Sequence, residues 1–116
     1  TEIASNTAKE YGGSSEIFID DLCDPVNNDE ESTKEVITSA EKIFGKEKVI
    51  TGIEKRFMAD NFADYFRKAP GCYVHVGSSD GERTSHDHHN EHFDLAETCY
   101  AYAAALHVQY ALDYLK

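Results

Sequence analysis

Apolar residues recur at helical spacing in the first half of the chain. The spacing predicts one helix over residues 3–11, stopped by Gly12-Gly13. It predicts a second helix that Asn28 or Asp29 caps and Gly45 closes. The stripe of apolar side chains on this second helix is expected to be buried, and it comprises Val36, Ile37, Ala40, Ile43 and Phe44.

Two more helices are predicted in the second half. A short amphipathic helix is expected over residues 60–68, before Pro70-Gly71, and a long one from Leu95 to about Leu115. Asp94 and Glu97 resemble a capping box at the start of the long helix. Because that helix is rich in alanine and tyrosine and has few charges, we expect burial on more than one side.

Short apolar stretches between the helices indicate strands. Residues 16–22 and 72–76 alternate with a period of two, and 48–51 is a third, shorter candidate. In residues 72–76 the alternation places Tyr73 and His75 on one face. Strands interleaved with helices predict an α/β fold, with a partial sheet and flanking helices.

Length and charge narrow the function classes. The chain has 116 residues, enough for one core, and 22 acidic against 11 basic residues give a net charge of −11. This charge repels nucleic acid and anionic membrane surfaces, and no apolar run is long enough to cross a bilayer. We therefore expect a soluble, cytoplasmic protein without nucleic-acid or membrane partners. Since residue 1 is Thr1, we also expect a piece of something longer.

The cysteines and the acidic residues near position 60 indicate no catalytic group by themselves. Cys23, Cys72 and Cys99 are odd in number and far apart, which predicts reduced thiols. Asp60, beside Asn61, is interpreted first as a helix cap and second as a member of an acid pair. His75 and His107 are each expected to be packed or exposed histidines rather than ligands.

The strongest chemical signal is a histidine-rich loop. The chain stays polar from Gly77 through Glu91, and four histidines lie at the far end, namely His86, His88, His89 and His92. Imidazole and carboxylate are ligands for zinc or manganese. Four histidines so close in sequence do not fit one coordination sphere unless the loop curls on itself. A solvated loop without a ligand is the alternative interpretation.

Several runs together resemble the C-terminal end of the aminoacylase and hippurate-hydrolase type of metallo-amidohydrolases. In order along the chain they are Phe57-Met58-Ala59-Asp60-Asn61-Phe62-Ala63-Asp64-Tyr65-Phe66, Pro70-Gly71-Cys72-Tyr73, Gly77, and His89-Asn90-Glu91-His92-Phe93-Asp94. The family usually has Met-Gly-(Ala/Ser)-Glu-Asp-Phe, a Pro-Gly turn, a strand ending in Gly, and His-x-Pro-x-(Phe/Tyr)-(Asp/Asn). This chain departs from that pattern at Asp60-Asn61 and at Glu91, which replaces the proline.

The resemblance implies a two-domain enzyme that hydrolyses small N-acyl amino acids or peptide-like amides. It implies a divalent metal (zinc, manganese or cobalt) that is shared with residues outside this chain. Residues 1–24 are then the end of a lid or dimerisation domain, with a helix and a strand, and residues 25–116 are the C-terminal part of the catalytic domain.

Site residues follow from the same resemblance. His89 is the implied metal ligand and His88 the runner-up, while Asp60, Asn61 and Gly77 are implied at the edge of the substrate pocket. No catalytic residue is carried over, so the fragment alone is expected to be inactive.

Two other interpretations stay open. In one, the chain is a stand-alone acidic metal-binding or interaction module that uses the histidine-rich loop. The neighbouring histidines would then compensate for the loss of the imidazole in His89→Ala. In the other, uncovered apolar helix faces make the chain a homo-oligomer.

Overall fold

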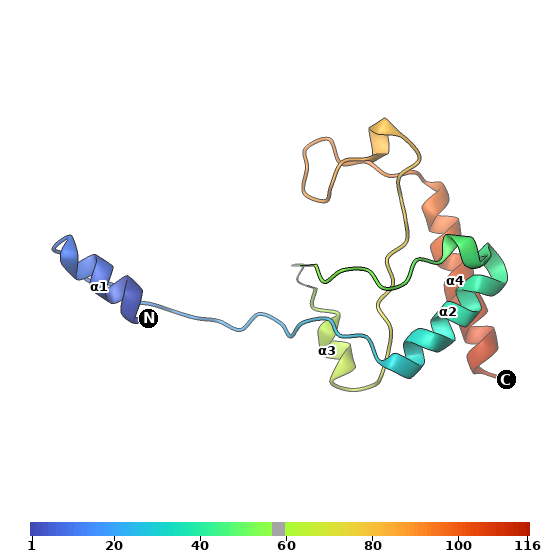
Figure 1. Ribbon diagram of the computed structural model, residues 1–116, viewed down its shortest axis with the longest axis horizontal. Coiled ribbons are helices and arrows are strands. Elements are labelled where there is room, and N and C mark those ends of the chain that lie inside the picture. Colours follow the sequence, from blue (N-terminus) through green and yellow to red (C-terminus); the bar gives the residue numbers. More distant parts are fainter. Residues whose placement is uncertain (57–59) are drawn as a thin grey trace.

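The computed structural model describes residues 1–56 and 60–116, and these residues form four α-helices and two 3₁₀ turns (Figure 1). The elements are α1 (Glu2–Glu10), α2 (Glu30–Phe44), η1 (Lys46–Lys48), α3 (Ala63–Phe66), η2 (Glu82–Thr84) and α4 (Thr98–Tyr114). The start of the first run that carries the family resemblance, Phe57-Met58-Ala59, lies outside the described residues.

The prediction of an α/β fold with a partial sheet is wrong, because the described ranges 1–56 and 60–116 contain helices and turns but no strand. A strand exists only through hydrogen bonds to a neighbouring strand, and the segments 16–22, 48–51 and 72–76 do not pair with one another. The backbone of Tyr73 forms hydrogen bonds with the side chain of Asn28 instead of with a neighbouring strand. Its N–H donates to Asn28 Oδ1 at 2.8 Å, and its carbonyl accepts from Asn28 Nδ2 at 3.0 Å.

Helix α2 begins and ends where its sequence predicts. The Asp29 side chain accepts a hydrogen bond from the backbone N–H of Ser32 at 2.8 Å, which satisfies one of the first free donors of the helix. Gly45 follows the last turn with φ 85°, a conformation that side-chain-bearing residues rarely adopt. Of the predicted apolar stripe, Ala40 is buried, whereas Ile43 remains 37% exposed.

Helices α2 and α4 cross obliquely and pack against each other (Figure 1). Their contact is partly polar, since Asp113 Oδ2 on α4 lies 2.8 Å from Lys42 Nζ and 2.9 Å from the buried Ser39 Oγ, both on α2. Gln109 Nε2 donates to the same oxygen at 3.0 Å. The hydrogen bonds from Lys42, Gln109 and Ser39 hold the pKa of Asp113 well below its usual range, so this carboxylate stays ionised.

Two expectations for the last helix are wrong. Helix α4 begins at Thr98 rather than Leu95, and the capping box does not form, because the Asp94 carboxylate pairs with Arg83 and Glu97 makes no side-chain cap. The helix is also not buried on several sides: Cys99 is its buried residue, whereas Tyr100 is 62% exposed.

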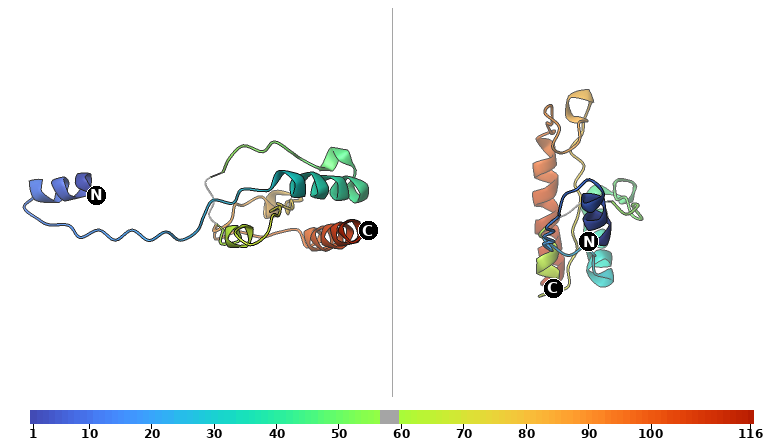
Figure 2. Two further views of the ribbon diagram at one scale, coloured as in Figure 1. Left: turned by 90° about the horizontal axis from the view of Figure 1, so that it is seen from below. Right: turned by 90° about the vertical axis from the view of Figure 1, so that its left-hand side faces the viewer.

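The described part of the chain has little interior. The buried apolar residues are all small, namely Ala40, Ala63, Ala96 and Cys99. The radius of gyration is 20.3 Å, against about 13 Å for a compact domain of this length. Helix α1 lies apart from the other helices at the end of a long extended segment (Figures 1 and 2). Among the described residues no helix is both long and apolar enough to cross a membrane.

Candidate functional site

The histidine-rich loop is folded back on itself by two consecutive turns. The backbone N–H of Asn90 donates to the carbonyl of Asp87 at 3.2 Å, and that of Phe93 donates to the carbonyl of Asn90 at 3.0 Å. His89 lies in the first turn with φ 66°, in the left-handed region. At the base of the loop the Arg83 guanidinium pairs with the Asp94 carboxylate, which joins the segments before and after the histidines. The curl required for several histidines to approach one another is therefore present.

The four histidines are all exposed, and the curl pairs two of them without bringing three or more together. The rings of His86 and His92 face each other with centroids 5.7 Å apart and planes tilted by 50°. The ring of His88 contacts Phe93 edge to face, at 5.2 Å. His89, in the first turn, takes part in neither of these ring contacts.

The loop does not by itself complete a metal site. Across residues 1–56 and 60–116 no three His, Cys, Asp or Glu side chains converge as a metal requires. The residues described here thus do not fit a complete ion-binding site, and a metal held through His89 needs ligands from other groups.

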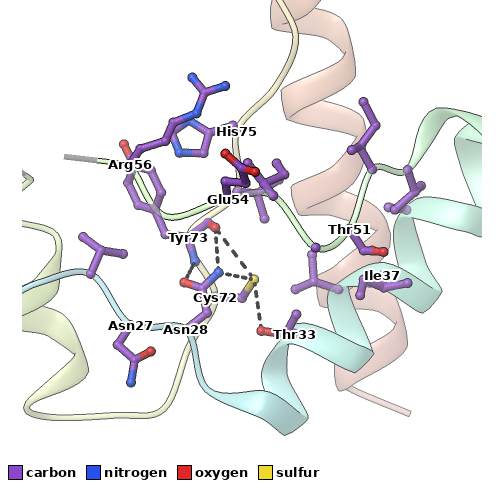
Figure 3. Close-up of a pocket in the computed structure, with 18 of the residues that line it drawn as sticks. Asn27, Asn28, Thr33, Ile37, Thr51, Glu54, Arg56, Cys72, Tyr73 and His75 are labelled. Atoms are coloured by element: carbon purple, nitrogen blue, oxygen red, sulfur yellow. Dashed lines mark hydrogen bonds between the residues drawn. The ribbon is translucent and has the colours of Figure 1, made fainter. Parts of the chain in front are cut away.

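A groove of about 660 Å³ lies between the start of α2 and the segments around residues 49–56 and 72–75 (Figure 3). Its apolar side includes Val36 and Ile37 of α2. Polar and charged side chains also line it: Glu54, Arg56, Asp60, Tyr73 and His75. Of the residues implied at the edge of a substrate pocket, Asp60 lines this groove, whereas Asn61 and Gly77 are exposed outside it.

Asp60 lines the groove, and its carboxylate accepts two hydrogen bonds. Its Oδ1 accepts the backbone N–H of Phe62 at 2.8 Å in the turn that leads into α3. The predicted helix cap is wrong, because α3 begins at Ala63 and has no side-chain cap. Asp60 Oδ2 accepts the hydroxyl of Tyr73 at 2.9 Å. The hydrogen bonds from Phe62 and Tyr73, and the nearby His75, lower the pKa of Asp60, while the bond to Asp60 raises the pKa of Tyr73.

Sequence reasoning did not find this cluster. The period of two correctly placed Tyr73 and His75 on one side, where their rings lie 5.2 Å apart. The contact with Asp60 joins residues that are thirteen positions apart, and only the turn at α3 creates it.

The groove and the histidine-rich loop are not brought together. Asp60 lies next to α3, whereas the loop follows η2, and the extended chain between α3 and η2 separates them (Figures 1 and 2). The structure therefore offers two separate polar regions.

The family model described as peptidase family M20/M25/M40 matches residues 15–113, which is most of the chain. The chain belongs to this family. Peptidases of the M20 family are hydrolases that generally use divalent metals, which confirms the predicted metal-dependent peptidase or amidohydrolase type. No curated protein and no solved structure matches the chain.

Proposed function

We propose that this M20 chain supplies the C-terminal part of the catalytic domain of an aminoacylase-type or hippurate-hydrolase-type enzyme. Its substrates are small N-acyl amino acids or peptide-like amides. The match over residues 15–113 carries the proposal, because it spans the Pro-Gly turn and the His89–Asp94 run from which the resemblance was drawn.

The division of the chain into two parts belongs to the same proposal. Residues 1–24 are assigned to the end of a lid or dimerisation domain, and residues 25–116 to the catalytic domain. The support is that α1 contacts its own following segment, with Ser5 Oγ 3.2 Å from Ser15 Oγ, whereas α2 and α4 pack together.

His89 is proposed as the one metal ligand that this chain contributes, to zinc, manganese or cobalt. Its exposure in the turn leaves its imidazole free to meet ligands from elsewhere. His88 is the less suitable donor, because its ring already contacts Phe93. Asp60, Asn61 and Gly77 are proposed at the edge of the substrate pocket, where the ionised Asp60 carboxylate would orient a polar substrate group.

The test uses the natural protein that carries residues 1–116. We expect His89→Ala to lower both its metal content and its kcat/KM for an N-acyl amino acid such as benzoylglycine, by at least about tenfold, since even loss of an outer partner of a metal ligand costs that much. His107→Ala, an exposed histidine of α4, is the matched control and should change neither. Unchanged metal content and activity in His89→Ala would refute the assignment.

A stand-alone acidic metal-binding or interaction module is the second candidate. The observation that favours it is the exposure of all four histidines in a loop that already curls. In that case the natural protein should bind metal without hydrolysing amides, and His89→Ala should leave binding almost unchanged because neighbouring histidines compensate.

A further inference from the structure

The ring pair of His86 and His92 is the part of the loop that the proposed enzyme function does not use. The two histidines are six positions apart, and the turns closed by Asn90 and Phe93 bring their rings to a centroid distance of 5.7 Å. Both side chains are open to solvent, so a hydrated ion reaches them without any rearrangement of the fold.

The spacing of the two rings suits a shared ion. Two imidazoles that bind one tetrahedral zinc at about 2.0–2.1 Å place their ring centroids roughly 5 Å apart. The observed centroid distance of 5.7 Å is close to that value. The other ring contact in the loop is unsuitable, because His88 contacts the apolar ring of Phe93 rather than a second donor.

The local charge also favours a cation. Glu91 Oε1 lies 3.6 Å from Nε2 of His92, too far for a hydrogen bond, so it adds negative charge without occupying that nitrogen. Asp87 lies next to His86 in the sequence, and the whole chain has a net charge of −11.

We propose that His86 and His92 form a second metal site, distinct from His89, that binds a borderline divalent cation such as Zn²⁺ or Ni²⁺. Imidazole nitrogen suits these ions, and water fills the remaining coordination positions because no third protein ligand converges among the described residues. Because only two protein ligands hold the ion, we expect this site to bind it weakly and to exchange it with solution.

The experiment is calorimetric titration of the protein with Zn²⁺ and, separately, with Ni²⁺. The variants are His86→Asn, His92→Asn, His88→Asn and His89→Asn, with His107→Asn as the control outside the loop. We expect His86→Asn and His92→Asn each to weaken the exchangeable site by at least about tenfold, since each removes one of two ligands. The other three variants should retain it. Circular dichroism of each variant checks that the helices are unchanged.

Three results would overturn the proposal: no binding, equal small losses in all four loop variants, or loss confined to His89→Asn. The first indicates a solvated loop, and the second indicates diffuse chelation. The third supports His89 as the family ligand while removing the second site. If metal binding is lost in His86→Asn and His92→Asn but kept in His89→Asn, the proposal of a second metal site holds even if the amidohydrolase proposal fails.

Discussion

At the scale of single residues, the decisive contact is between Asp60 and Tyr73. One carboxylate accepts both the Phe62 backbone N–H, in the turn before α3, and the Tyr73 hydroxyl, and so it ties that turn to the segment that follows Gly71. The sequence predicted a helix cap at Asp60, but the bond to Phe62 closes only a local turn, because α3 begins at Ala63 without a side-chain cap. The sequence did not predict the bond to Tyr73, because that partner depends on how the chain turns back.

We expect Tyr73→Phe to raise the pKa of Asp60 toward the usual value of about 3.9. The hydroxyl stabilises the ionised carboxylate, and the Phe62 N–H still lowers the pKa in the variant. The stabilisation from the Tyr73 contact is therefore present above the unfolded pKa and lost as the pH falls through the lowered folded pKa. Carbon-13 NMR titration of the Asp60 carboxyl group measures the change.

The matched control for this titration is Tyr100→Phe, which removes a hydroxyl from a ring that is 62% exposed on α4. It should leave the pKa of Asp60 unchanged. An equal pKa in the wild-type protein and in Tyr73→Phe would show that the hydrogen bond does not persist in solution.

At the scale of elements, α2 and α4 differ in how far their sequences decide their ends. Asp29 caps the start of α2 and Gly45 follows its last residue, so local patterns located both ends. Helix α4 begins three residues later than expected, because Asp94 pairs with Arg83 instead of capping. A salt bridge to a residue eleven positions upstream is not visible in a capping pattern.

Gly45→Ala should destabilise the end of α2 by about 1–3 kcal/mol, because φ 85° is a strained conformation for a residue with a Cβ atom. The new Cβ would also lie 2.6 Å from the Glu47 carboxylate, but that flexible side chain can move away. Urea unfolding followed by circular dichroism measures the loss.

Gly81→Ala is the control for this substitution. Gly81 has extended backbone, φ 168°, and nothing within 4 Å of an added Cβ atom. Its unfolding midpoint should stay within error of the wild-type value. Equal unfolding curves for both variants would contradict a strained Gly45.

At the scale of the whole molecule, the chain exposes far more surface than a compact protein of its mass. Its accessible area is 10,119 Å², against about 6,300 Å² expected for a folded monomer of 13.0 kDa. Large apolar side chains contribute to this excess, such as Phe18, Ile50 and Leu115, which are 81%, 78% and 81% exposed. The excess of accessible area is larger than a standard protein interface. The exposed apolar surfaces are therefore suited to pack against another polypeptide.

We expect small-angle scattering of the dilute 116-residue chain to give a radius of gyration near 20.3 Å rather than about 13 Å. The apparent mass should rise with concentration, as exposed apolar faces associate. A compact, concentration-independent monomer would contradict both the extended shape and the expected self-association.

Local signals in the sequence are sufficient to predict the helices that they bound and the family to which the chain belongs. Asp29, Gly45 and Gly12-Gly13 act on residues a few positions away, and the motifs that carry the resemblance are contiguous runs. The folded structure was needed to show that the strand-like segments do not pair, that the Asn28 side chain bonds the backbone of Tyr73, and that the His86 ring lies near that of His92. Alternation shows that a segment is able to join a sheet, but a strand requires a partner whose position no local pattern specifies.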